Sequence, residues 1–201
     1  VHFEHRLFGL DPILQRADRL LNHTEGISEV EASRWCGDIL TLRSEEQFWR
    51  NNPTNALNLG ARAVAATSPE SYFVRGLAVY YQGLSLHVSG DSIKAKRLLR
   101  QYLQQGVPAS ASADARLLLG LCVFQQDSLQ LDELESTAQI LLRHGEANRF
   151  LISKAWGHYF LGTASYYKND LDTAQLHFLA GAGLRNNANG MCIHECLVGL
   201  T

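Results

Sequence analysis

The stretch GTASYYKNDLDTAQLHF, residues 162–178, decides the fold. Gly162 lies in an apolar helical segment, Asn169-Asp170 marks a turn, and Ala174 and Phe178 lie in a second helical segment. Phe178 follows Ala174 by one helical turn, so both face the same side of that segment. Small residues let two antiparallel helices approach closely, and a large residue fills the space beside them. The stretch therefore predicts a tightly packed helical hairpin.

The same spacing recurs along the chain. Gly83 precedes Ala95 by the same interval that separates Gly162 from Ala174. The second helices carry small residues at Ala56, Ala95 and Ala174, and the second of these intervals is close to twice the first. The first helices carry glycines at similar intervals, at Gly83, Gly120 and Gly162. A period of about 40 residues with two helices each is typical of a helical solenoid. Residues 132–135 hold no small residue where one is expected, so this hairpin is expected to be more open.

Helical spacing continues through the rest of the sequence, and no segment shows the two-residue alternation of a strand. We predict an all-α, right-handed solenoid of about ten helices, in a single domain over residues 1–201. The chain lacks an initiator Met and its last residues are apolar, so we expect a fragment of a larger protein. The expected units are roughly 10–26, 27–67, 70–106, 110–145 and 149–185, with a truncated last helix over 187–201.

The amino-acid composition argues against several classes of function. The net charge is −2, from 18 basic and 20 acidic residues, which gives no basic surface for nucleic acid or anionic lipid. No apolar run could span a bilayer, and the start lacks a secretory signal. Four cysteines are far fewer than a disulfide scaffold needs, so a reducing cytoplasm is expected.

The repeats resemble the tetratricopeptide pattern, and their residues resemble those of one group of proteins in particular. Residues 155–162 (AWGHYFLG), 166–171 (YYKNDL) and 177–178 (HF) are similar to the repeat region of the large ATP-binding LuxR-type transcription regulators, which include the maltotriose-responsive activator. Residues 73–78, 116–120 and 197–200 follow the same pattern. The resemblance runs from about Leu10 to the end.

The resemblance implies the sensor segment of a multidomain signalling ATPase. The flanking modules of that group are not in this sequence, which has no phosphate loop and no recognition helix with basic flanks. Nucleic acid would thus be bound only through a domain outside this chain. The ATPase and DNA-binding residues of the group cannot be carried over to this sequence.

The cysteines and histidines that could bind a metal or act in catalysis are predicted to have structural roles instead. Cys192 and Cys196 are four apart on one helix face, but no second ligand pair accompanies them, so two packed thiols are favoured over a metal site. His158 and His177 lie within repeat helices, where a partly buried, hydrogen-bonded ring is the usual role. No nucleophile motif is present. We expect no catalytic residue, no cofactor and no metal.

A binding surface is predicted from repeat geometry. In tetratricopeptide hairpins the concave face of the first helix carries the residues six and three before, and one and four after, the small glycine. This rule gives a largely aromatic and apolar groove, suited to a small ligand, a sugar ring or an apolar peptide. The alternative is burial between repeats, which is favoured for Leu84, Leu117 and Leu121 and is equally weighted for Trp156, Tyr159 and Tyr166. Two arginines near first-helix starts could pair with an anionic ligand or with nearby carboxylates. The candidate binding residues are Arg75, Tyr80, His87, Arg116, Phe124, Trp156, Tyr159 and Tyr166.

The sequence thus favours a sensor domain that binds a small-molecule inducer or a protein or peptide partner in its groove. The alternative is a stand-alone tetratricopeptide adaptor that holds partner proteins together. An adaptor is expected to have an open, charged groove, which the aromatic first helices disfavour. Self-association of the chain is left open.

Overall fold

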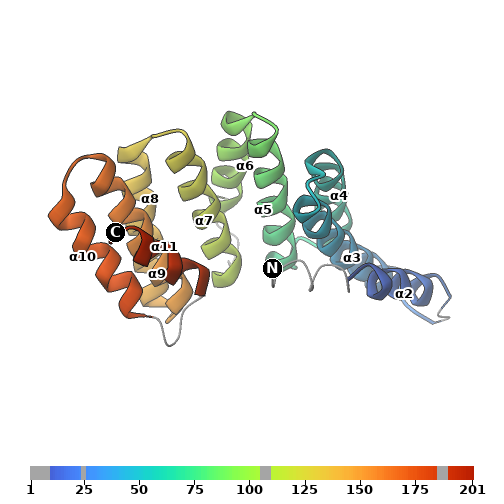
Figure 1. The fold of residues 1–201 in the computed structure, drawn as a ribbon. Coiled ribbons are helices and arrows are strands. Elements are labelled where there is room, and N and C mark those ends of the chain that lie inside the picture. Colours follow the sequence, from blue (N-terminus) through green and yellow to red (C-terminus); the bar gives the residue numbers. More distant parts are fainter. Residues whose placement is uncertain (1–9, 24–25, 105–109, 185–189) are drawn as a thin grey trace. The chain divides into compact units, whose positions relative to one another are not determined.

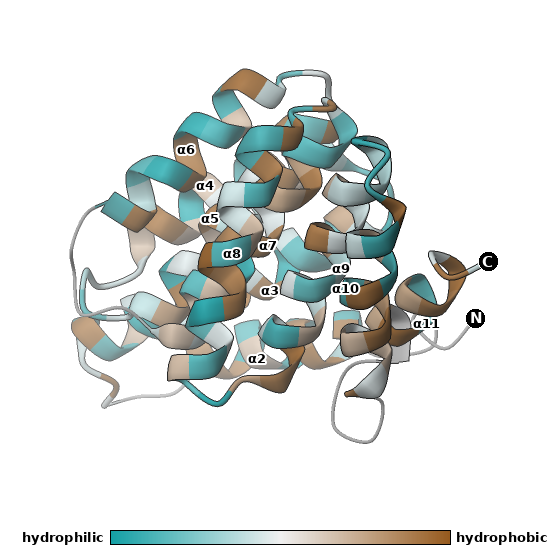
Figure 2. Cartoon of the chain, turned by 90° about the vertical axis from the view of Figure 1, so that its left-hand side faces the viewer, coloured by the Kyte–Doolittle hydropathy of each residue, from teal (hydrophilic) through white to brown (hydrophobic). Residues whose placement is uncertain are grey.

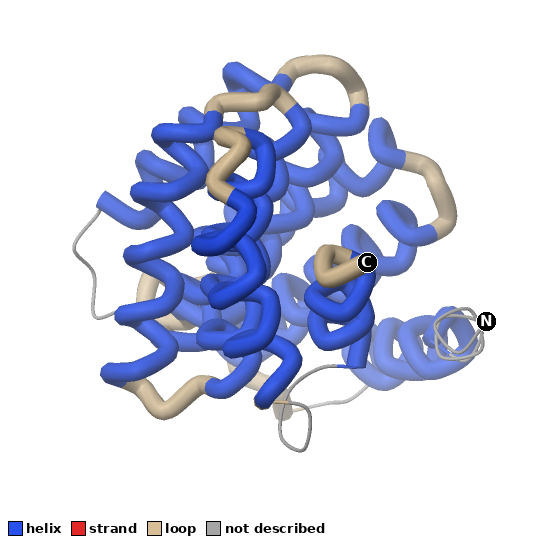
Figure 3. Tube along the Cα trace, turned by 60° about the vertical axis from the view of Figure 1, so that its left-hand side comes forward, coloured by secondary structure: helices blue, strands red, loops and turns tan. Residues whose placement is uncertain are grey.

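The computed structural model describes residues 10–23, 26–104, 110–184 and 190–201. In these ranges the chain is helical and contains no strand, as Figure 3 shows. This confirms the predicted all-α class. The helices, labelled in Figure 1, are α2 (Leu10–His23), α3 (Glu29–Trp49), α4 (Pro53–Ala66), α5 (Tyr72–Val88), α6 (Ser92–Gln104), α7 (Ala111–Asp127), α8 (Leu131–Ala147), α9 (Leu151–Tyr167), α10 (Leu171–Gly183) and α11 (Gly190–Val198).

The chain divides into two compact units, with the boundary between Ala113 and Asp114 in the first turn of α7. None of the helices in the described ranges combines the length and apolar character needed to cross a lipid bilayer. Hydrophobic and hydrophilic residues alternate along helices such as α6 and α8 (Figure 2), as expected for helices with one buried face.

The first unit contains two helical hairpins. Helix α3 pairs with α4, α5 pairs with α6, and α5 also packs on α3 and α4. Helix α2 lies against α3, where Arg43 and Asp18 form an ion pair. A core of buried residues joins three helices, from Leu40 on α3 through Leu59 and Ala63 on α4 to Ala78 on α5. The hairpins therefore share one apolar interior.

The second unit is built around α9, which packs against α8, α10 and α11. Its largest buried side chains include Phe124, Leu134 and Phe160. At the far end of α9, Lys168 forms ion pairs with Asp132 and Glu135 of α8. These charges are exposed, so their contribution to stability is small compared with the apolar core.

The predicted close approach of the helices is found in both units. A Cβ added to Gly83 would lie 2.2 Å from Leu99 Cδ1, and one added to Gly162 would lie 2.7 Å from the Phe178 ring. Leu99 and Phe178 each lie one helical turn after a buried alanine, Ala95 or Ala174. The small glycine, the small alanine and the large residue thus form one packing unit in α5–α6 and again in α9–α10.

Five connections use the same turn. In each, the second residue before the next helix has a positive φ: Asn51 (59°), Gly90 (91°), Leu129 (52°), Arg149 (56°) and Asn169 (62°). Glycine and asparagine suit this left-handed region, whereas leucine and arginine do not. The residue after the left-handed one often caps the helix, as when Asp170 accepts the backbone N–H of Thr173. The turn is therefore kept even where its residue types are unfavourable.

Candidate functional site

The two tight hairpins place equivalent side chains on the faces of their first helices. Tyr80 and His87 lie three residues before and four after Gly83 on α5, and Tyr159 and Tyr166 take the same positions around Gly162 on α9. A separation of seven residues is close to two helical turns, so each pair shares one helix face. Tyr80, His87 and Tyr159 are half-buried, and Tyr166 is 55% exposed. These four side chains therefore keep accessible surface.

The residue that lies between the two members of each pair on the helix face is buried. Leu84 on α5 and Thr163 on α9 both follow the small glycine by one residue, and both are buried. Thr163 donates its hydroxyl to the backbone carbonyl of Tyr159 at 2.9 Å, so its polar group is satisfied within α9. Helices α5 and α9 thus each present two accessible side chains on either side of a packed residue.

On α5 His87 has a polar contact with a neighbouring helix, and Tyr80 packs against the buried Tyr81 of its own helix. His87 Nδ1 lies 2.9 Å from the hydroxyl of Ser92, the first residue of α6. The Tyr80 ring packs edge-on against Tyr81, with centroids 5.3 Å apart. The Tyr81 hydroxyl donates to Glu45 of α3 at 2.6 Å, and burial, reinforced by this carboxylate, raises the pKa of Tyr81. Tyr81 therefore stays protonated, and Tyr80 packs against a buried ring that is hydrogen-bonded to α3.

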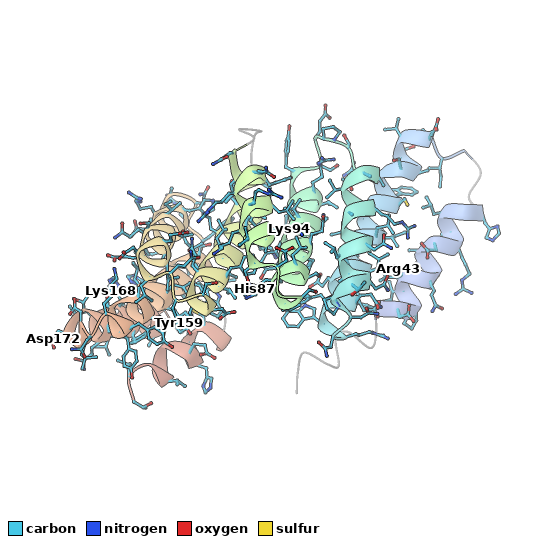
Figure 4. All side chains as sticks on the ribbon, turned by 90° about the horizontal axis from the view of Figure 1, so that it is seen from above. Arg43, His87, Lys94, Tyr159, Lys168 and Asp172 are labelled. Atoms are coloured by element: carbon cyan, nitrogen blue, oxygen red, sulfur yellow. The ribbon has the colours of Figure 1, made fainter. Side chains whose placement is uncertain are left out.

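On α9 Tyr159 belongs to an aromatic cluster. Its ring lies 5.5 Å from Trp156, 5.0 Å from Phe160 and 6.3 Å from Phe178, measured between centroids. The side chain of Gln126 on α7 lies close enough to its hydroxyl to act on its pKa. Burial raises the pKa of Tyr159 above its usual value. Tyr159, labelled in Figure 4, is thus a fixed aromatic ring with a neutral hydroxyl.

The other predicted binding residues are less accessible or have structural partners. Arg75 donates to the backbone carbonyls of Val64 and Thr67, both at 2.8 Å, and so caps the end of α4. The partners found for Arg75 are thus backbone carbonyls and not the nearby carboxylates that the sequence suggested, and its pairing with an anionic ligand stays a prediction. Phe124 and Trp156 are buried, and Arg116 is half-buried on α7. Leu84, Leu117 and Leu121 are buried, as the packing interpretation expected.

The candidate binding residues fall in both units. Arg75, Tyr80 and His87 belong to the first, and Arg116, Phe124, Trp156, Tyr159 and Tyr166 to the second. Around Gly83 and Gly162 the positions three before and four after the glycine combine accessibility with a shared face, whereas around Gly120 the same positions, Leu117 and Phe124, are buried. The contacts of Gln126, Glu45 and Ser92 come from adjacent helices, and no motif around them marked these residues in the sequence.

The histidine pair and the cysteine pair noted in the sequence each bring their two side chains together. His158 and His177 are half-buried with their Nδ1 atoms 3.2 Å apart, which confirms the partly buried, hydrogen-bonded interpretation. Cys192 and Cys196 are buried free thiols that lie next to each other on α11. In the described part of the chain no three residues of the His, Cys, Asp or Glu type gather closely enough to hold a metal ion together.

Comparison with protein-family models, with curated proteins and with solved structures finds no match to this chain.

Proposed function

We propose that the chain is the effector-binding helical-repeat domain of a cytoplasmic signalling regulator of the LuxR type. The observation that carries the binding role is the repeated pair of accessible side chains around the small glycine, Tyr80 with His87 and Tyr159 with Tyr166. The resemblance of residues 155–178 to the sensor repeats of those regulators supports the regulatory context.

The side chains on the accessible faces of α5 and α9 favour a ligand that combines apolar surface with hydroxyl groups. Tyrosine rings stack on sugar rings or apolar side chains, and their hydroxyls donate and accept hydrogen bonds. In the ordinary pH range both Tyr159 and Tyr81 are neutral, because burial raises the pKa of each phenol. An oligosaccharide or the apolar face of a peptide helix fits this surface better than a strongly charged ligand does.

Binding would regulate the parent protein through a shift in population. A ligand shifts an equilibrium between resting and active states only by its difference in affinity for the two. The face of α9 is suited to this role because Tyr159 touches α7 through Gln126 and α10 through Phe178. A ligand that moves Tyr159 would therefore alter the packing of two neighbouring helices.

A stand-alone adaptor is the second candidate, since tetratricopeptide-like hairpins also hold protein partners. The two candidates differ in their ligand: the sensor binds a small inducer or a regulatory protein, and the adaptor only a protein or peptide. The exposed apolar side chains Leu176 and Leu179 on α10 are compatible with a protein partner.

Two probes test the proposed surface, namely maltotriose and an amphipathic helical peptide of leucine, alanine and lysine. Isothermal titration calorimetry is expected to show binding of at least one probe, with Tyr166→Ala weakening it about tenfold, as for an aromatic anchor. Tyr167→Ala is the control and is expected to weaken binding less, because Tyr167 is 54% exposed, lies about 100° around α9 and meets the surface only through its edge-on contact with Tyr166 at 5.8 Å between ring centroids. Absence of binding by both probes, or an equal loss in the two variants, would count against this surface.

A further inference from the structure

A pair of histidines, one on α9 and one on α10, joins the two helices of this hairpin. His158 and His177 face each other through their Nδ1 atoms at 3.2 Å, with ring centroids 5.4 Å apart and planes tilted by 40°. Because one imidazole must donate and the other accept, one ring carries its proton on Nδ1 and the other has a lone pair there. Two nitrogen donors from different helices thus meet at one point.

Packing holds the two rings in this position. Gly181, one turn after His177, is buried, and a Cβ added to it would lie 3.5 Å from His158 Cβ and 2.6 Å from Cys196 Sγ. The helices α9, α10 and α11 therefore approach each other closely beside the histidines. Since His158 and His177 are half-buried, they keep limited access to solvent.

The charges around the pair favour neutral rings. Burial lowers the pKa of His158, and His177 and Lys154 lower it further, against the opposing effect of Glu146. Burial also lowers the pKa of His177, against the effect of Glu135. Neutral imidazole is the form that binds metal ions. Near neutral pH no proton has to be expelled from an imidazolium before a metal can bind.

We propose that His158 and His177 together bind one divalent transition-metal ion, with zinc as the reference ion, through their two Nδ1 atoms. Two nitrogen ligands at the usual zinc distance lie about 3.3 Å apart around a tetrahedral ion, close to the separation in this hairpin. Binding moves the Nδ1 proton of the donor ring to its Nε2, so both lone pairs face the metal and no net charge is lost.

The site has two protein ligands, and water fills the remaining positions. In the described residues no third His, Cys, Asp or Glu completes a cluster. Glu135 and Glu146 act on the rings through their negative charge, which favours a dication, and the positive charge of Lys154 near His158 opposes it. The ion would tie α9 to α10 next to Tyr159, and the inference does not depend on the function proposed for that residue.

Calorimetry of the untagged full chain with zinc chloride at pH 7.5 tests the site. We expect one ion per chain and a higher unfolding temperature with zinc, because the ligand binds the folded state. His158→Gln and His177→Gln are each expected to weaken binding at least about tenfold, since each removes half of a chelate. His194→Gln is the matched control, because His194 is exposed on α11.

Cobalt distinguishes the histidine pair from the nearby thiols, Cys192 and Cys196. Cobalt bound by imidazole and water gives visible absorption without the near-ultraviolet charge-transfer band of a cobalt–thiolate bond. We expect no such band, and we expect affinity to fall as the pH drops and both rings become protonated. Failure of the wild-type chain to bind zinc, binding unchanged in both variants, or a thiolate band would each overturn the proposal.

Discussion

Replacing Gly162 by alanine tests the packing on which the repeat depends. An added methyl carbon would lie 2.7 Å from Cδ1 and Cε1 of Phe178 and 3.1 Å from Cζ. Carbon atoms pack best at about 3.5–4.0 Å, so the ring has to move by most of an ångström. The other edge of the same ring borders Gly199, where an added Cβ would lie 2.7 Å from Cε2 and Cζ. Phe178 is thus enclosed on both sides and has little room to shift.

The expected magnitude follows from two opposing effects. Overpacking in an enclosed core costs about 2–3 kcal/mol, in the upper part of the usual range. Replacing glycine by alanine inside a helix stabilises the folded state by about 1 kcal/mol. Gly162→Ala should therefore lower the free energy of unfolding by about 1–2 kcal/mol, or the unfolding temperature by a few degrees. Gly183 on α10 is the matched control, because no heavy atom lies within 4 Å of its added Cβ. Gly183→Ala should be neutral or stabilising by up to about 1 kcal/mol.

Urea unfolding followed by far-ultraviolet circular dichroism measures both variants. A second substitution, Phe178→Leu, should relieve the clash, so that the double variant loses less stability than the two single variants predict together. If Gly162→Ala is as stable as Gly183→Ala, the close approach of α9 to α10 at this point is refuted.

Three further predictions concern single residues. The free energy of unfolding should fall as the pH drops below about 6.5. The reason is that His158 and His177 take up protons in the unfolded chain before they do in the folded one, where their pKa values are lowered. In an acid titration, the stability of His177→Gln should depend less on pH than that of the wild type. Arg75→Ala should cost about 1–3 kcal/mol in urea unfolding, since two charge-assisted hydrogen bonds to the end of α4 are lost, and an unchanged midpoint would contradict this capping role. Leu129→Gly should raise the free energy of unfolding by about 1 kcal/mol, because leucine is held at φ 52° and is 63% exposed; a destabilised variant would refute the strain.

The helical architecture could be predicted from the sequence because local patterns determine it. Apolar spacing predicted helices and no strand, and the described residues form helices without a strand. The Gly162–Ala174–Phe178 spacing predicted a tight hairpin, and the Phe178 ring does lie against Gly162. The turns were less predictable. Leu129 and Arg149 occupy left-handed positions that the sequence gives no reason to expect, and only the repeated hairpin geometry imposes them.

The candidate site could be predicted only in part. Helical register placed Tyr159 and Tyr166 on one face, which depends on spacing alone. The depth of burial depends on neighbouring helices, so Phe124 and Trp156 could not be separated from the accessible residues in advance. The contact of Arg75 with two backbone carbonyls involves main-chain groups, which carry no signature in the sequence.

The most direct test of the proposed regulatory role is the sequence of the complete reading frame that encodes this chain. We predict a Gly-x-x-x-x-Gly-Lys-Ser/Thr phosphate loop in the segment before the repeats and a helix-turn-helix in the segment after them. Such a frame would make the helical repeats the sensor between an ATPase and a DNA-binding module. A reading frame with neither element would contradict the regulator and favour the adaptor.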